Sequence, residues 1–231
     1  MMIKTVIFDI DNTLYSYDKN HVYGMEALAA YCETAFGITA KEMKNCYSRA
    51  GRIMTDRIGT DTAAIHSRMI RMQCMLELLE QPLFPHARNM YHAYWDKFIE
   101  HIEPNPGVLK FMQELKKRKI RIGIGTDMTA YIQYRKLEAI GAAPYIDFIV
   151  TSEEAGIEKP HAHFFDICVE KAGVCAEECA FIGDNVKKDI EGAWESGLKG
   201  IWYTQEKEAP ERRCFPTLRS FTEIDVDEFL K

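Results

Sequence analysis

The second half of the chain alternates between short apolar runs and segments with helical periodicity, and this alternation restricts the fold more than any other feature. Because neighbouring parallel strands need a long crossover, usually a helix, the alternation is typical of a parallel sheet. We therefore predict an α/β fold, a Rossmann-like parallel sheet covered by helices on both faces. The expected strands are 120–125, 148–150, 180–182 and 200–203, and the expected helices are 108–119, a segment ending at 140, 161–172 and 186–196.

A further strand is expected near the N-terminus, where Thr5–Phe8 forms a short apolar and β-branched run. The region 15–104 shows apolar stripes with a 3.6-residue period, which predicts a helical domain inserted after that strand. Its end is marked by the helix-breaking sequence Glu-Pro-Asn-Pro-Gly at 103–107. We expect one domain formed by 1–14 and 105–231, and an inserted helical domain formed by 15–104.

Composition limits the partners of such a chain. The 231 residues include 29 Lys and Arg and 35 Asp and Glu, so the formal net charge of −6 gives no basic field for nucleic acid. No apolar run approaches the roughly 20 residues that span a bilayer. We expect a cytoplasmic protein with a small-molecule partner, no nucleic acid and no membrane; the sequence does not define its oligomeric state. The seven cysteines lack zinc or disulfide spacings and are expected to be reduced and mostly buried.

Polar residues gather at the carboxyl ends of the expected strands, the edge where open parallel sheets bind ligands. One such residue would be an ordinary turn residue. Together, however, the strand ends bring carboxylates, a hydroxyl and an ammonium to one edge. The segments that follow the strands are Asp9-Ile10-Asp11-Asn12-Thr13, Thr126-Asp127, Glu158-Lys159-Pro160 and Gly183-Asp184-Asn185.

Carboxylates that converge on one point repel each other unless a hard divalent cation lies between them. Mg²⁺ is therefore the expected cofactor, with a phosphate oxygen as a further ligand. Lys159 and Thr126 are suited to neutralise and hydrogen-bond the remaining phosphate oxygens. The sequence thus predicts a phosphoryl-transfer site. A dinucleotide site is not expected, because the third glycine that should follow Gly123-Ile124-Gly125 is replaced by Met128.

In order along the chain, these segments resemble the four motifs of the haloacid dehalogenase-like (HAD) hydrolases. The matching residues are Asp9 to Thr13, Thr126, Lys159-Pro160, and Gly183-Asp184 followed by Asp189. The resemblance covers almost the whole chain, and the helical insert corresponds in position to the α-helical cap of one HAD subgroup. It implies a Mg²⁺-dependent phosphatase that hydrolyses a small phosphate monoester through an aspartyl-phosphate.

The resemblance also implies a role for each matching residue. Asp9 is the implied nucleophile, and Asp11 the acid that protonates the leaving alcohol and the base that activates water. Mg²⁺ is implied to bind the side chains of Asp9 and Asp184 and the backbone carbonyl of Asp11. The phosphoryl group is implied to bind Thr126, Asp127 and Lys159, while Asn185 and Asp189 support the metal through hydrogen bonds.

Two positions depart from the family pattern. Relatives usually place a glycine shortly after the hydroxyl of the second motif, whereas this chain has Asp127-Met128. Relatives commonly continue Lys-Pro with Asp-Pro, whereas this chain has His161-Ala162-His163. We interpret His161 as a helix-start residue and not as a ligand.

Several functional alternatives remain open. The Asp at position 11 favours phosphate esters over halides or phosphonates, but a phosphomutase of the β-phosphoglucomutase type keeps the same motifs. A non-catalytic binding protein on a HAD scaffold is the second alternative. A nucleoside monophosphate is our first guess for the substrate. Candidate contacts for a base or a second anion are Tyr15, Tyr17, Arg49, Arg52 and Arg57, although surface arginines and packed tyrosines are the favoured interpretation.

Overall fold

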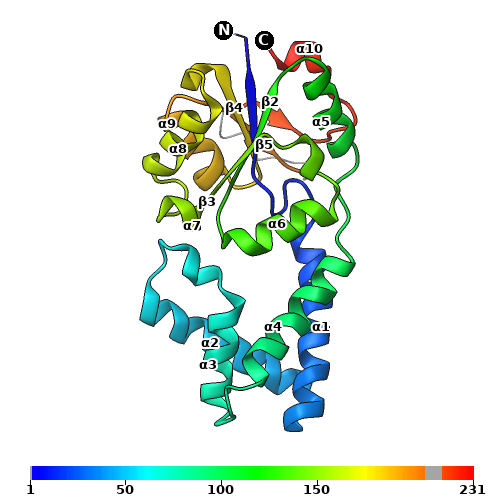
Figure 1. The fold of residues 1–231 in the computed structure, drawn as a ribbon, viewed down its shortest axis with the longest axis vertical. Coiled ribbons are helices and arrows are strands. Elements are labelled where there is room, and N and C mark those ends of the chain that lie inside the picture. Colours follow the sequence, from blue (N-terminus) through cyan, green and yellow to red (C-terminus); the bar gives the residue numbers. More distant parts are fainter. Residues whose placement is uncertain (1, 206–214) are drawn as a thin grey trace. The chain divides into compact units, whose positions relative to one another are not determined.

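The computed structural model describes residues 2–205 and 215–231 and divides into two compact units. The sheet unit comprises Met1–Ser16 and Glu103–Lys231, and the helical unit comprises Tyr17–Ile102 (Figure 1). The helical unit is thus inserted after the first strand. The segment 206–213, whose polar and charged composition predicts a surface loop, lies outside the described residues.

The sheet unit is built on a six-stranded parallel sheet, as predicted from the strand and helix alternation. Its strands lie in the order β3-β2-β1-β4-β5-β6. Because β1 lies between β2 and β4, the strand order reverses at β1, and open sheets bind ligands beside such a switch point. The strands are β1 Thr5–Phe8, β2 Arg121–Thr126, β3 Phe148–Thr151, β4 Cys179–Gly183, β5 Lys199–Tyr203 and β6 Thr217–Leu218.

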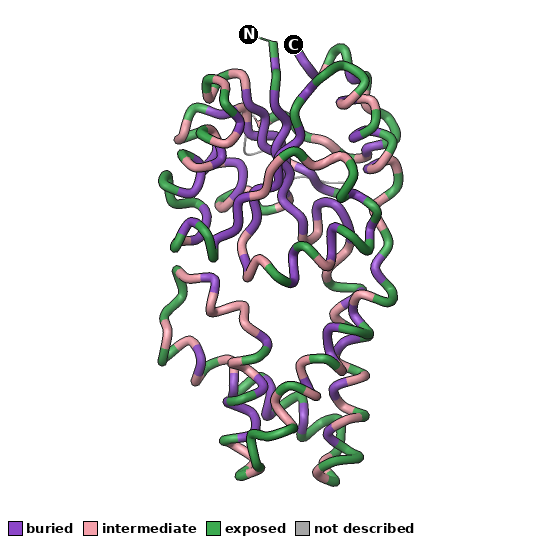
Figure 2. Tube along the Cα trace, in the orientation of Figure 1, coloured by how far each residue is buried: buried purple, intermediate pink, exposed green. Residues whose placement is uncertain are grey.

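Helices cover both faces of this sheet, as the strand pattern requires (Figure 1). Successive strand residues point to opposite faces. Phe8 therefore contacts Phe111 of α5 (Val108–Lys117) on one face. On the other face, Phe181 contacts Phe165 of α8 (Ala162–Ala172). Buried residues follow the strands closely, so the core of this unit lies along both faces of the sheet (Figure 2).

The segment after β4 differs from the expected regular helix 186–196. It begins as a π-helical turn, Val186–Glu191, and continues as the short helix α9, Gly192–Glu195. The carboxylate of Asp189 accepts a hydrogen bond from the backbone N of Asn185, 2.9 Å away, so it faces back toward the strand end. Such π-turns are frequent at functional sites. The remaining helices of the sheet unit are α6 Ala130–Ala139, α7 Ser152–Ala155 and α10 Val226–Phe229.

The helical unit consists of four main helices and one short 3-10 turn. Within it, α1 packs chiefly against α4, and α2 packs against α3. Gly24 permits the close approach of α1 and α4, since a Cβ at this position would lie 2.8 Å from the Tyr94 ring. The elements are α1 Tyr17–Phe36, α2 Ala40–Ile58, η1 Ala63–His66, α3 Arg68–Leu78 and α4 His86–Glu100.

Two expectations from composition concern the cysteines and membrane-spanning helices. The six described cysteines are all free, and only Cys175 is exposed. In residues 2–205 and 215–231, no helix combines the length and the hydropathy that crossing a membrane requires.

Candidate active site

The candidate site is built on the turn that follows β1. Asn12 adopts a left-handed conformation with φ of 61°, which asparagine tolerates better than most residues. The backbone N of Leu14 donates to the carbonyl of Ile10 at 2.9 Å and closes the turn. This tight turn holds Asp9 at the carboxyl end of the central strand, where its side chain is buried.

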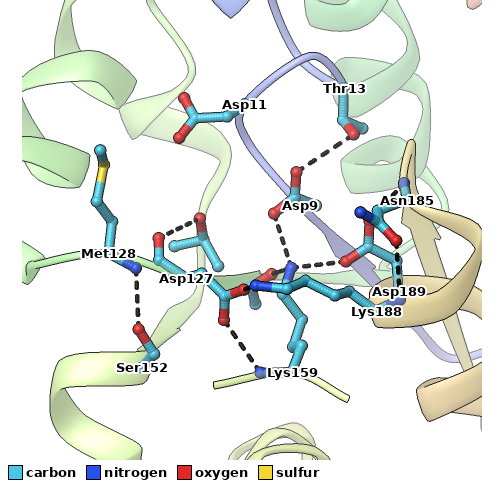
Figure 3. A network of polar contacts seen from close by, with 12 residues as sticks. Asp9, Asp11, Thr13, Asp127, Met128, Ser152, Lys159, Asn185, Lys188 and Asp189 are labelled. Carbon is cyan, nitrogen blue, oxygen red and sulfur yellow. Dashed lines mark hydrogen bonds and ion pairs between the residues drawn. The ribbon is translucent and has the colours of Figure 1, made fainter. Parts of the chain in front are cut away.

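Lys159 is the centre of the polar network drawn in Figure 3. Its Nζ lies 2.8 Å from Asp9 Oδ1 and 2.7 Å from Asp189 Oδ1. It also donates to the backbone carbonyl of Gly125 at 3.1 Å. Lys159 is only 3% exposed, so water cannot solvate its ammonium group. The oxygen atoms of these three partners balance its charge instead. Lys159, in the segment between α7 and α8, thus contacts one residue that follows β1, one in β2 and one in the turn after β4.

Three carboxylates surround this single ammonium. Oxygens of Asp9, Asp184 and Asp189 lie within 4.8 Å of one another. Burial raises the pKa of Asp9 well above its usual range, with a further contribution from the neighbouring carboxylates, although Lys159 opposes the shift. Burial and the proximity of Asp189 raise the pKa of Asp184 to about 7. Three carboxyl groups thus share one ammonium, which is why protons are held more tightly there, and their oxygen atoms suit a divalent cation.

Asp11 belongs to a different set of contacts. Lys136 Nζ lies 2.8 and 2.9 Å from its two carboxylate oxygens, and the hydroxyl of Tyr15 donates to it. Burial opposes ionisation of Asp11, but these contacts outweigh it and lower its pKa. Figure 3 shows the carboxylate of Asp11 directed away from that of Asp9. The structure thus brings Asp11 into the same turn but not into the carboxylate cluster.

Thr126, at the end of β2, is buried, and its hydroxyl accepts a hydrogen bond from Gln133 Nε2 at 2.7 Å. Both carboxylate oxygens of the neighbouring Asp127 have partners. Its Oδ1 accepts from the backbone N of Lys159 at 3.1 Å, and its Oδ2 lies 2.8 Å from Lys188 Nζ. Asp127 was predicted to bind the phosphoryl group; in this structure its side chain fixes the loop that carries Lys159.

Asn185 also has a clear position. Its side chain oxygen accepts from the backbone N of Lys188 at 3.0 Å and caps the π-helical turn, while its own backbone N donates to Asp189. Asn185 therefore orients the segment that carries Asp189. His161, interpreted from the sequence as a helix-start residue, is the N-cap of α8, and its ring accepts from the backbone N of His163.

Met128 occupies the position where a glycine was expected. Its backbone φ of 105° lies in a region that residues other than glycine rarely adopt. The side chain is nonetheless buried, and its sulfur lies 3.3 Å from Lys136 Nζ. The backbone N of Met128 donates to Ser152 Oγ at 2.9 Å. Methionine at this position thus retains the backbone turn and adds a contact to the lysine that holds Asp11.

Sequence reasoning missed three side chains of this network: Gln133, Lys136 and Lys188. Gln133 and Lys136 lie on the buried face of α6 together with Ile132 and Leu137. A lysine and a glutamine within an apolar helical stripe are a signal that could have identified them, because such residues are seldom fully buried without partners. Lys188 bridges Asp127 and Glu158 at 2.8 and 2.9 Å and carries no comparable signal.

The chain is similar to known proteins over most of its length. The family described as haloacid dehalogenase-like hydrolase matches residues 3–197. The chain is 32% identical to a ribulose-1,5-bisphosphate 5-phosphatase of Halopiger xanaduensis, over 90% of this chain and 87% of that protein. It is 30% identical to a glyceraldehyde 3-phosphate phosphatase of Methanocaldococcus jannaschii (85% and 83%) and 26% identical to the pyrimidine 5'-nucleotidase YjjG of Escherichia coli (89% and 88%).

The fold also has a counterpart among solved structures. A HAD phosphatase from Thermococcus onnurineus superposes with a TM-score of 0.76 at 20% sequence identity, covering 99% of this chain and 98% of the other. The shared fold therefore includes both the sheet and the inserted helices.

Proposed function

Since the chain belongs to the haloacid dehalogenase-like hydrolases, we propose that it is a Mg²⁺-dependent phosphatase acting on a small phosphate monoester. The observation that carries the proposal is the 2.8 Å contact between Lys159 Nζ and Asp9 Oδ1, beside Asp184 and Asp189. It pairs a nucleophilic carboxylate with a cation that can neutralise a phosphoryl group. In this proposal the sheet unit is the catalytic core and the helical unit is the cap.

Asp9 is the proposed nucleophile. One carboxylate oxygen attacks the phosphorus, the bond to the leaving alcohol breaks, and an aspartyl-phosphate forms; water then attacks the phosphorus and restores the carboxylate. Burial opposes the charge on Lys159, but Asp189 and Asp9 raise its pKa, so the ammonium stays charged. Lys159 and the Thr126 hydroxyl are proposed to hold the transferring group, and Asp127 to position Lys159.

Asp11 is the proposed acid and base. As a base Asp11 must be deprotonated, and its lowered pKa favours the deprotonated form. As an acid it must carry a proton when the alcohol departs, and the close contact with Lys136 opposes this. We therefore propose that the ion pair between Lys136 and Asp11 loosens before the first step.

The residues fit a divalent metal by the chemistry of the donor set, since three buried or half-buried carboxylates converge beside one lysine. We propose that Mg²⁺ is held by Asp9, Asp184 and the backbone carbonyl of Asp11, with Asp189 and Asn185 as supports. When bound, the ion supplies positive charge that offsets the charge of the phosphoryl oxygens. Asp189 is also within reach of direct ligation, because its oxygens belong to the same cluster.

For the substrate we propose a small phosphorylated metabolite. Two relatives that are 30% identical or more over at least 85% of this chain are named for sugar phosphates, and a bacterial relative at 26% identity is named for pyrimidine nucleotides. This ordering favours a sugar phosphate over the nucleoside monophosphate first suggested by the sequence. A phosphomutase and a non-catalytic binding protein remain the alternatives.

The test is phosphate release from sugar phosphates, nucleoside monophosphates and other small esters, with Mg²⁺ or with EDTA. We expect wild type to release phosphate from one class only with Mg²⁺, and Asp9→Asn, which keeps the shape but loses the nucleophile, to release none. Arg88→Met, a change of an exposed arginine in the helical unit, is the control. Turnover retained by Asp9→Asn would reject the mechanism. Isomerisation of a sugar phosphate without phosphate release would favour the mutase.

A further inference from the structure

Gln133 is a fully buried amide that contacts the end of β2 from α6 (Figure 1). Its Nε2 lies 2.7 Å from the hydroxyl oxygen of Thr126 and 2.8 Å from the backbone carbonyl oxygen of Asp127. The hydroxyl of Thr126 also donates to that carbonyl, at 3.1 Å. An amide, a hydroxyl and a carbonyl of the sheet unit thus meet at a residue proposed to hold the phosphoryl group.

These contacts fix which end of the Gln133 amide faces Thr126. A backbone carbonyl can only accept hydrogen bonds, so the group that lies 2.8 Å from the Asp127 carbonyl must be the NH2 group. The amide nitrogen cannot itself accept, and therefore the Thr126 oxygen accepts from Gln133. One acceptor position of the hydroxyl is then occupied, and its single proton must be donated to another partner.

The other end of the amide shows that packing alone does not explain Gln133. Its Oε1 is buried and has no hydrogen-bond partner among the described residues. A buried acceptor without a partner is costly, and an apolar side chain of the same length would avoid that loss. Ile132 and Leu137, which share the buried face of α6, are apolar. The contacts of the NH2 group therefore explain this glutamine better than the stability of the helix does.

We infer that Gln133 is a positioning residue that makes the Thr126 hydroxyl available as a donor to the phosphoryl group. In the free protein the Thr126 proton is donated to the Asp127 carbonyl. When a phosphoryl oxygen is present, the proton turns to that oxygen, while Gln133 continues to donate to the carbonyl. The carbonyl keeps a partner throughout, so the turn costs little. This role rests on the proposed function and deepens it, since it needs a phosphoryl group at Thr126.

The buried face of α6 also reaches Asp11. Lys136 lies three residues after Gln133, about one turn along the helix, and contacts both carboxylate oxygens of Asp11. Burial raises the pKa of Asp11, whereas Lys136 and, to a smaller extent, Gln133 lower it. A change of Gln133 has two possible routes to the reaction, through Thr126 or through Asp11. The experiments below therefore combine changes of Gln133 and Thr126.

Binding of inorganic phosphate is measured first, because it needs no turnover. The full-length protein is titrated with phosphate by calorimetry in the presence of Mg²⁺. We expect Thr126→Val, which removes the hydroxyl, to weaken binding about tenfold. Gln133→Met should weaken it about threefold to tenfold, because the hydroxyl then stays on the Asp127 carbonyl. The double variant should bind no more weakly than Thr126→Val alone.

Ile132→Met is the matched control, because it places the same new side chain at the preceding position of the same buried helix face. It should bind phosphate as wild type does. Urea unfolding without phosphate checks that every variant is folded, and Gln133→Met should be no less stable than Ile132→Met, since it removes an oxygen that has no partner.

Turnover is the second readout. Gln133→Met should lower kcat/KM about tenfold in the wild-type background and leave it unchanged in the Thr126→Val background. The same loss in both backgrounds would show that Gln133 acts through Asp11 or through packing, and would overturn the inference. Phosphate binding by Gln133→Met equal to that by Ile132→Met, or no phosphate binding by wild type, would also overturn it. If wild type binds phosphate with the expected dependence on Gln133 but hydrolyses no ester, the proposed phosphatase activity fails and the role of Gln133 stands.

Discussion

The two units of this protein bury polar clusters of opposite sign. In the sheet unit, three carboxyl groups gather around the single ammonium of Lys159. In the helical unit, two arginines gather around Tyr47 without a described carboxylate partner. Hydrogen bonds and aromatic rings surround the guanidinium of Arg68, whereas the carboxyl groups outnumber their one cation and suit a bound metal ion.

The largest effect is expected at the one cation of the sheet unit. Lys159→Met leaves Asp9 and Asp189 without compensation, so the free energy of unfolding of the metal-free protein at pH 7 should fall by about 3 to 5 kcal/mol. Turnover should be lost as well. Urea unfolding measures the first effect, and Mg²⁺ should restore part of the stability because it replaces the missing positive charge. Unchanged stability in EDTA would mean that the carboxylates do not need the lysine.

The second effect concerns Asp11, which stands apart from the carboxylate cluster. Lys136 lowers the pKa of Asp11, so Lys136→Met should raise that pKa and move the acidic limb of the kcat profile to higher pH. We expect kcat to fall about tenfold to a hundredfold, as for impaired acid–base catalysis. Lys136→Arg should retain most of the activity. An unchanged pH profile for Lys136→Met would contradict a role for Lys136 in positioning Asp11.

The third effect is the dependence of metal binding on pH. Asp184 has a pKa of about 7 in the metal-free fold, so below pH 7 Mg²⁺ must displace a proton. Affinity measured by calorimetry should fall by up to about tenfold for each pH unit below 7, because Asp184 must lose its proton before it binds the ion. The metal-free protein should in turn lose stability as pH rises from the unfolded-state pKa of Asp184 through 7, since the folded state binds that proton more tightly. An affinity for Mg²⁺ independent of pH would contradict this assignment.

The smallest effect is expected at the arginine of the helical unit. Arg68 donates to the Tyr17 hydroxyl and the His66 carbonyl but leaves no carboxylate uncompensated, so Arg68→Met should lower the free energy of unfolding by about 1 to 2 kcal/mol. Urea unfolding measures the change. A loss as large as that of Lys159→Met would show that the helical unit already compensates Arg68, and the comparison between the two clusters would fail.

The sequence was informative where residues are adjacent to strand ends. The alternation of strands and helices predicted the parallel sheet, because parallel pairing requires long crossovers, and the carboxyl ends of β1, β2 and β4 brought Asp9, Thr126 and Asp184 to one edge. It was less informative where a side chain reaches across the fold. Lys136 lies 125 positions from Asp11, and only the packing of α6 brings the two together.

The helical unit illustrates the same limit. The arginines considered from the sequence lie on α2, at Arg49, Arg52 and Arg57, whereas the buried Arg68 lies at the start of α3. Arg68 shares a helical face with the buried Met72 and Met75, and this pattern is the signal that could have identified it. The π-helical turn after β4 was also missed, because its apolar period differs little from that of a regular helix.

The central claim is that Asp9 carries the phosphoryl group during turnover. The most direct measurement is mass spectrometry of peptides from wild type that is mixed with Mg²⁺ and a hydrolysed ester and quenched in acid within milliseconds. The account predicts a phosphoryl adduct on Asp9, formed and lost during turnover and absent in Asp9→Asn. Turnover without an adduct, or an adduct on another residue, would contradict it.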